Sequence, residues 1–96
     1  MNRDIGSMIV CTPGTVGGRP RIDGTRMPVQ AIAVYYKQGY SPEDIAEIFE
    51  HLTLAQVHAA LTYYHANQAE IEAAIVAEDE LYEKAANEQL QVRKKA

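Results

Sequence analysis

Residues 39–57, GYSPEDIAEIFEHLTLAQV, contain the start signals of two consecutive helices. Ser41, followed by Pro42 and two acidic residues, has the pattern of a helix N-cap with proline at the first helical position. Thr53 repeats this arrangement, because Gln56 three residues later completes a capping box. Only about four residues separate the two predicted helices, which is the connection length of a helix-turn-helix.

Apolar side chains recur at helical spacing around these caps and predict three helices, over residues 29–38, 42–50 and 54–66. Gly39 falls where a residue in the left-handed conformation ends the first of them. The spacing predicts one common core, made of Val29, Ile32, Ala33, Tyr36, Ile45, Ile48, Phe49, Val57, Ala60, Leu61 and Tyr64.

The segment before these helices is GGRPRIDGTRMPV, residues 17–29, and it contains too many glycines and prolines for a helix. We expect two short extended segments around a turn at Asp23-Gly24, because glycine supplies the positive φ of a tight hairpin turn. Ile9-Val10-Cys11 favours one further short strand. Residues 1–8 are expected to form a flexible N-terminus, and residues 9–67 the folded domain.

Residues 68–96 form a predicted helical extension, since no glycine or proline follows Pro42. The extension either continues the third helix or forms a fourth helix after Asn67. Its apolar side chains leave a partial stripe that an acidic residue interrupts. A charged helix with such a thin apolar face packs on a partner protein or covers its own core. The residues that we assign to a partner are Ile71, Ile75, Glu78, Leu81 and Tyr82.

The formal net charge of −4 conceals an uneven distribution. Residues 1–40 carry five basic and two acidic side chains, whereas residues 41–92 carry eleven acids and one lysine. This pattern favours two faces with different partners, or else an ordinary acidic domain with scattered arginines. The small size and the surplus of apolar positions favour a homodimer. Without a membrane span or a signal peptide, we expect a cytoplasmic protein.

The sequence contains no pattern of catalytic residues, so we expect neither an enzyme nor a cofactor. A single cysteine excludes a disulfide framework and a cysteine-based zinc site. The three histidines, His51, His58 and His65, are predicted to be exposed, and no metal site is expected.

A nucleic-acid interface is a second possible use of the chain. The arginines Arg19, Arg21 and Arg26 would neutralise phosphates, while Gln56 and Thr62 of the third helix would contact bases. However, residues 53–66 contain no lysine or arginine. The alternative is that the arginines pair with the acidic face of the second helix.

Several segments together resemble a small prokaryotic family, the domain of unknown function 433 (DUF433). The segments are GRPRI and GTRMPV at 18–29, GYSPEDI at 39–45, and LTLAQVHAAL at 52–61 followed by Tyr63-Tyr64. The resemblance extends over roughly residues 9–71. Met27 is a mild departure, since a branched aliphatic residue is expected there.

The resemblance implies a homeodomain-like three-helix (helix-turn-helix) core with a short N-terminal β element. With the C-terminal helical extension that the sequence predicts, the expected fold is mainly α. It also implies the antitoxin of a type II toxin–antitoxin pair, with a PIN-like nuclease toxin as partner. In such an antitoxin, we expect the N-terminal part to dimerise and to bind operator DNA. Two hypotheses therefore stand. The chain is an antitoxin, or it is a non-catalytic protein-interaction module that does not bind DNA.

Overall fold

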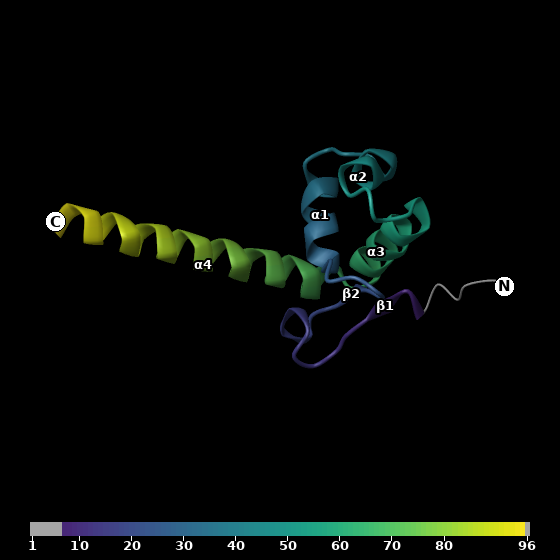
Figure 1. The fold of residues 1–96 in the computed structure, drawn as a ribbon, viewed down its shortest axis with the longest axis horizontal. Coiled ribbons are helices and arrows are strands. Elements are labelled where there is room, and N and C mark those ends of the chain that lie inside the picture. Colours follow the sequence, from purple (N-terminus) through teal and green to yellow (C-terminus); the bar gives the residue numbers. More distant parts are fainter. Residues whose placement is uncertain (1–6, 96) are drawn as a thin grey trace.

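The computed structural model describes the backbone of residues 7–95 and the side chains of residues 7–86. The fold is mainly α, as predicted, with four helices and one two-stranded antiparallel sheet near the N-terminus (Figure 1). Of the predicted flexible N-terminus, residues 1–6 lie outside the described residues. The elements are β1 Ile9–Val10, a turn of 3-10 helix at Val16–Gly18, β2 Arg21–Ile22, α1 Val29–Lys37, α2 Pro42–Ile48, α3 Leu54–Ala66 and α4 Gln68–Lys95.

Both predicted N-caps form, and this explains where α2 and α3 begin. The hydroxyl of Ser41 accepts a hydrogen bond from the Asp44 amide at 3.1 Å, and the Asp44 carboxylate accepts one from the Ser41 amide at 3.2 Å. Thr53 and Gln56 make the same reciprocal pair at 3.1 and 2.7 Å. At the other end of α1, Gly39 has a φ of 100°, as predicted for the residue that ends this helix.

Two positions predicted for the core are at the surface instead. Tyr36 is 38% exposed. Its ring packs against those of the buried Tyr64 and the exposed His65, and so lies at the edge of the core. Ile48 is 43% exposed. It is the last residue of α2, which ends two residues before the predicted boundary because Phe49 leaves the helical conformation, with φ −104° and ψ 81°.

The N-terminal β element has the predicted turn but a different strand pairing. Gly24 has a φ of 81°, and the Thr25 amide donates to the Ile22 carbonyl at 3.1 Å. The segment that returns from this turn does not form a strand with β2: it makes an isolated bridge between Arg21 and Pro28, in which the Ile22 amide donates to the Met27 carbonyl at 3.0 Å. The strand that pairs with β2 is β1, in the antiparallel register Ile9↔Ile22 and Val10↔Arg21.

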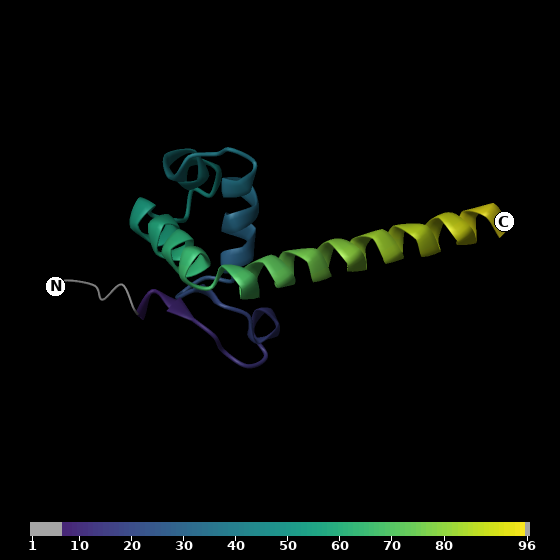
Figure 2. The same ribbon diagram turned by 180° about the vertical axis from the view of Figure 1, so that it is seen from behind.

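The core lies between α1, α2 and α3, and the first turns of α4 close it on one side. Figures 1 and 2, two opposite views, both show α4 leaving this core and projecting far from the other helices. The longest extent of the molecule is therefore 61 Å, against 29 and 25 Å in the other directions. The buried residues of the core are Ile22, Val29, Ile32, Ala33, Ile45, Leu52, Val57, Ala60, Leu61, Tyr64, Ile71 and Ile75.

Candidate functional site

The base of α4 is fixed to the domain by apolar and polar contacts. Ile71 and Ile75 are only 2% and 8% exposed and belong to the core, so they are not available to a partner. Between them, the carboxylate of Glu72 lies 2.6 Å from Nζ of Lys37 in α1 and accepts a hydrogen bond from the Tyr64 hydroxyl of α3 at 2.5 Å. These contacts join α4 to two other helices.

A further contact fixes α4 one turn beyond the core. Gln30 in α1 is 4% exposed, and its amide donates a hydrogen bond to the carboxylate of Glu78. Glu78 is partly buried, whereas residues 79–86, the next part of α4 whose side chains are described, are exposed throughout. We call residues 79–95 the α4 arm. The predicted extension thus consists of an anchored base and a projecting arm.

The arm carries an exposed apolar surface. Leu81 and Tyr82 are 69% and 71% exposed, and they line an open groove of about 320 Å³ together with Glu78 and Ala85. Since successive residues of an α-helix are rotated by about 100°, these four residues lie on the side of α4 that also carries the buried Ile71. We call Glu78, Leu81, Tyr82 and Ala85 the α4 seam. It continues the core-facing side of α4 beyond the end of the core.

The acids of the arm lie on other sides of the helix. Asp79, Glu80 and Glu83 are all exposed, and the helical rotation places them beside or opposite the α4 seam. One flat surface cannot therefore touch the seam and all three acids at once. A partner that uses both must surround the helix, or must sense the acids through their negative potential.

The three arginines predicted to bind DNA have different surroundings. Arg21 is partly buried, and its two terminal nitrogens donate to the Thr25 carbonyl and the Thr12 hydroxyl, both at 2.9 Å. Arg19 is also partly buried, and its Nε donates to the Val16 carbonyl at 3.0 Å. Arg26 alone of the three is exposed. The structure does not bring the three together as one exposed basic surface.

The two residues predicted to contact bases also differ. Gln56 is partly buried, and its side-chain oxygen is engaged in the capping box with Thr53. Thr62 is exposed in the third turn of α3. The β element packs against α3, and Ala59 of this helix is 5% exposed.

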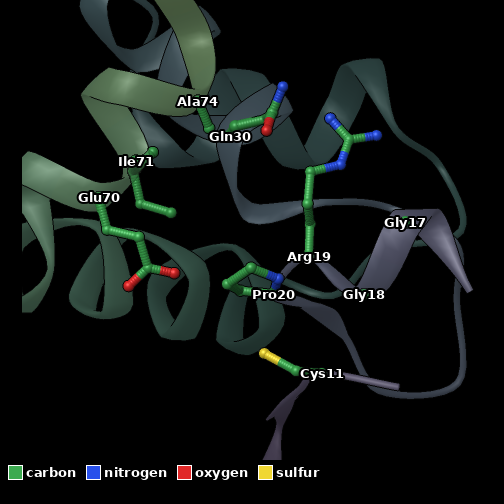
Figure 3. Close-up of a pocket in the computed structure, with 9 residues that line it drawn as sticks. All are labelled: Cys11, Gly17, Gly18, Arg19, Pro20, Gln30, Glu70, Ile71 and Ala74. Atoms are coloured by element: carbon green, nitrogen blue, oxygen red, sulfur yellow. The ribbon is translucent and has the colours of Figure 1, made fainter. Parts of the chain in front are cut away.

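A cleft of about 260 Å³ lies where the N-terminal loop meets α1 and the base of α4 (Figure 3). Arg19 and Pro20 come from the loop, Gln30 from α1, and Glu70 from the first turn of α4. Burial raises the pKa of the Tyr63 hydroxyl, and the negative charge of Glu70 raises it further. The remaining lining residues are Cys11, Gly17, Gly18, Ile71 and Ala74.

Metal and histidine chemistry find little support within the described residues. No group of three or more histidine, cysteine, aspartate or glutamate side chains there is arranged to hold a metal ion. His51, His58 and His65 are exposed, as predicted. None of the helices described is both long and apolar enough to pass through a membrane.

The residues that hold α4 in place could not be identified from sequence patterns. Gln30 and Glu78 are separated by 48 positions, and Lys37 and Glu72 by 35. Such pairs leave no local signal in a single sequence. The only relevant signal was the glutamate that interrupts the apolar stripe, Glu78, which turns out to be the residue that meets Gln30.

The fold and its surfaces define a mainly α domain with a two-stranded β element and a long C-terminal helix, of which residues 79–86 are exposed. The family model described as "Protein of unknown function (DUF433)" matches residues 9–64, more than half of the sequence, and the chain belongs to this family. The match ends before α4 begins at Gln68, so the anchored base and the arm lie beyond it.

A solved structure supports the same assignment. The chain is similar to the crystal structure of a DUF433 member protein from Anabaena variabilis, with 35% sequence identity and a TM-score of 0.67. The similarity covers 72% of this chain and 68% of the other. No curated protein matches the chain.

Proposed function

We propose that this protein is a cytoplasmic antitoxin whose α4 arm binds and inhibits a PIN-like nuclease. The observation that carries the proposal is the exposure of Leu81 and Tyr82 on a helix that the domain holds at its base. An apolar surface of this kind on a projecting helix is typical of a segment that inserts into a groove of a partner.

The anchored base gives the arm a fixed direction. The contacts of Glu72 with Lys37 and Tyr64, and of Gln30 with Glu78, hold the helix up to the point where the α4 seam begins. Because the domain already orders the first ten or so residues of α4, extending the helix does not require a new nucleus. Less conformational entropy is then lost when a partner binds the arm.

The chemistry of the arm indicates a basic partner. Asp79, Glu80 and Glu83 surround the helix on the sides that the α4 seam leaves free. A nuclease that grips RNA phosphates presents basic side chains, and these would meet the acids while an apolar groove covers Leu81 and Tyr82. The apolar contacts supply most of the affinity, since exposed ion pairs contribute only about 0–1 kcal/mol each. The choice of a PIN-like nuclease follows from the family resemblance.

The contacts of the arginines favour inhibition through protein contacts over binding of operator DNA. Both terminal nitrogens of Arg21 donate hydrogen bonds within its own domain, and so does Nε of Arg19. Arg26 and Thr62 are exposed and stay available for a weak contact with DNA. Without further cations on α3, phosphate neutralisation would be small.

We also propose that the free protein is a homodimer in which two copies of the α4 seam cover each other. Exposure of the Leu81 and Tyr82 side chains to water on a projecting helix is unfavourable, because burial of apolar surface is stabilising. The same seam would then serve the nuclease or a second copy, but not both at once.

Co-expression with the nuclease-like product of the adjoining gene tests the inhibitor role. A chain that ends at Glu78 keeps the anchored base and lacks the arm, and it should fail to bind the nuclease and to restore growth. The double variant Leu81→Ser/Tyr82→Ser should fail in the same way. Val76→Ser is the matched control, because Val76 is 53% exposed on the opposite side of α4 and should be neutral.

The acids are tested separately from the seam. The variant Asp79→Asn/Glu80→Gln/Glu83→Gln should weaken binding, most clearly at low salt. Glu43→Gln/Glu47→Gln/Glu50→Gln changes the net charge equally on and just after α2 and should leave binding unchanged. If the chain ending at Glu78 inhibits the nuclease as well as the full chain does, the arm is not the inhibitor and the proposal fails.

A further inference from the structure

The cleft beside the base of α4 combines two opposite charges that do not pair with each other. Arg19 comes from the N-terminal loop and Glu70 from α4, and both line the cleft. Among the residues that the structure describes, neither makes an ion pair within 4.0 Å. In Figure 3, the guanidinium of Arg19 lies on the same side of the cleft as Gln30, and the carboxylate of Glu70 lies on the side of Pro20 and Cys11.

Arg19 is held in position before any ligand arrives. Its Nε donates to the Val16 carbonyl at 3.0 Å, and its backbone amide donates to the same carbonyl at 3.2 Å. The two terminal nitrogens have no hydrogen-bond partner within the described part of the chain. A guanidinium that is fixed at Nε and open at its two ends is suited to a carboxylate, which it binds through two parallel hydrogen bonds.

The loop that holds Arg19 has an unusual backbone. Val16 has a φ of 51°, which is rare for a β-branched residue, and Gly17 and Gly18 follow with φ of 64° and 77°. Strain of this kind persists where the surroundings determine it, and it is concentrated at binding sites. Here the left-handed turn forms one wall of the cleft and presents the Val16 carbonyl to Arg19.

The rest of the lining is apolar or neutral. Ile71 and Ala74 from α4 and the buried Pro20 also line the cleft. Its volume of about 260 Å³ is below the range of about 300–1,000 Å³ for drug-sized ligands, which favours a small molecule.

We propose that this cleft binds a small zwitterion of the α-amino-acid class. The carboxylate of the ligand binds the terminal nitrogens of Arg19, its ammonium group lies toward Glu70, and an apolar side chain contacts Ile71 and Ala74. A ligand with both charges satisfies both ends of the cleft, whereas a simple anion would leave Glu70 without a partner and be repelled by it. This site is independent of the α4 arm and of the proposed nuclease.

Titration of the full chain with three matched probes tests the proposal. The probes are L-leucine, isocaproate, which lacks the ammonium group, and isoamylamine, which lacks the carboxylate. We expect L-leucine to bind at millimolar concentration or below and more tightly than either analogue, with amide shifts in nuclear magnetic resonance spectra at Arg19, Gln30 and Glu70. Equal binding of isocaproate would overturn the proposal that the ligand is a zwitterion. Absence of binding by all three probes would overturn the proposal that the cleft is a binding site.

Two variants test whether the charges of Arg19 and Glu70 bind the ligand. Arg19→Gln should weaken L-leucine binding by about tenfold or more, whereas Arg26→Gln, the same change at an exposed arginine, should not alter it. Glu70→Gln is a conservative change at an exposed position that should leave folding intact. It should abolish the preference for L-leucine over isocaproate, while Glu80→Gln on the arm retains that preference. Unchanged binding in both cleft variants would overturn the proposal.

The single cysteine provides an independent readout. Cys11 is exposed, lines the cleft and is the only cysteine in the sequence. L-leucine should therefore slow alkylation of Cys11 by iodoacetamide in the full chain, and it should lose this effect in Arg19→Gln. If L-leucine binds but leaves the alkylation rate unchanged, it binds outside this cleft and the assignment is overturned.

Discussion

Oε2 of Glu72 in α4 lies 2.6 Å from Nζ of Lys37 in α1. Its other carboxylate oxygen accepts the hydrogen bond of the Tyr64 hydroxyl. One side chain therefore joins the base of α4 to both α1 and α3. The hydrogen bond from Lys37, followed by that from Tyr64, lowers the pKa of the Glu72 carboxyl. In turn, the hydrogen bond with Glu72, followed by burial, raises the pKa of Tyr64.

The lowered pKa of Glu72 predicts a dependence of stability on pH. In the unfolded chain this carboxyl titrates near its ordinary pKa of 4.5, and in the folded chain it titrates below that value. Its stabilising contribution is therefore fully present above the unfolded pKa and is lost as the pH falls through the folded pKa. The free energy of unfolding should decrease across this acidic range, as measured by urea denaturation at a series of pH values.

Glu72→Gln isolates this effect from the other acids. The variant should be less stable than the original chain near neutral pH, and the difference should shrink on acidification because the original chain loses the same charge. Glu83→Gln on the arm is the matched control and should show no such convergence. A stability difference for Glu72→Gln that stays constant from neutral to acidic pH would contradict the assignment.

The division of α4 into base and arm predicts opposite effects of similar substitutions. Ile71→Ala should cost about 2–5 kcal/mol of unfolding free energy, because the side chain is 2% exposed and leaves a cavity. Leu81→Ala, at 69% exposure, should change it by no more than about 0.5 kcal/mol. Urea denaturation of both variants measures the difference. Equal losses would mean that the arm also packs on the domain.

The same division predicts where the chain can be shortened. A chain ending at Glu78 should unfold cooperatively with nearly the stability of the full chain, since it keeps Ile71, Ile75 and the contact with Gln30. A chain ending at Asn67 lacks part of the core and should be strongly destabilised. Circular dichroism during urea titration distinguishes the two, and a stable chain ending at Asn67 would show that the base is dispensable.

Arg21 is predicted to stabilise the fold. Its two terminal nitrogens connect Thr12 and Thr25, which lie on either side of β2 along the chain, while its Nε is buried without a partner within the described residues. Arg21→Lys cannot make both contacts and should cost about 1–2 kcal/mol of unfolding free energy, less than two fully satisfied charged hydrogen bonds would suggest. Arg26→Lys should be neutral. A harmless Arg21→Lys would return this arginine to the candidates for DNA binding.

The fold could be predicted largely because its signals are local. Each capping box involves residues three positions apart, and Gly39 adopts the positive φ that its place after a helix predicts. Where the outcome depended on packing between distant segments, pattern alone was insufficient. The spacing that buries Ile45 also pointed to Ile48, yet α2 ends there and leaves it exposed.

The candidate site was predicted only in part, for the same reason. The apolar stripe of α4 was visible in the sequence, but periodicity does not tell where a helix leaves its own core. Ile71 is buried and Leu81 is exposed, although both belong to one stripe. Likewise, three arginines close in sequence suggested one basic surface, whereas Arg21 donates to Thr12 and Thr25 within the domain and Arg19 lines the cleft. Spacing alone does not show which of these side chains the surrounding loops hold in place.

The exposed α4 seam predicts self-association of the free protein. In sedimentation equilibrium at tens of micromolar, the full chain should be a dimer, because burying Leu81 and Tyr82 of two copies against each other removes apolar surface from water. The chain ending at Glu78 and the variant Leu81→Ser/Tyr82→Ser should both be monomers, while Val76→Ser should remain a dimer. Addition of the nuclease should convert the dimer to a complex with the nuclease, because both partners need the same seam. A dimer that persists in the chain ending at Glu78 would place the self-association surface elsewhere, on the domain that residues 9–67 form.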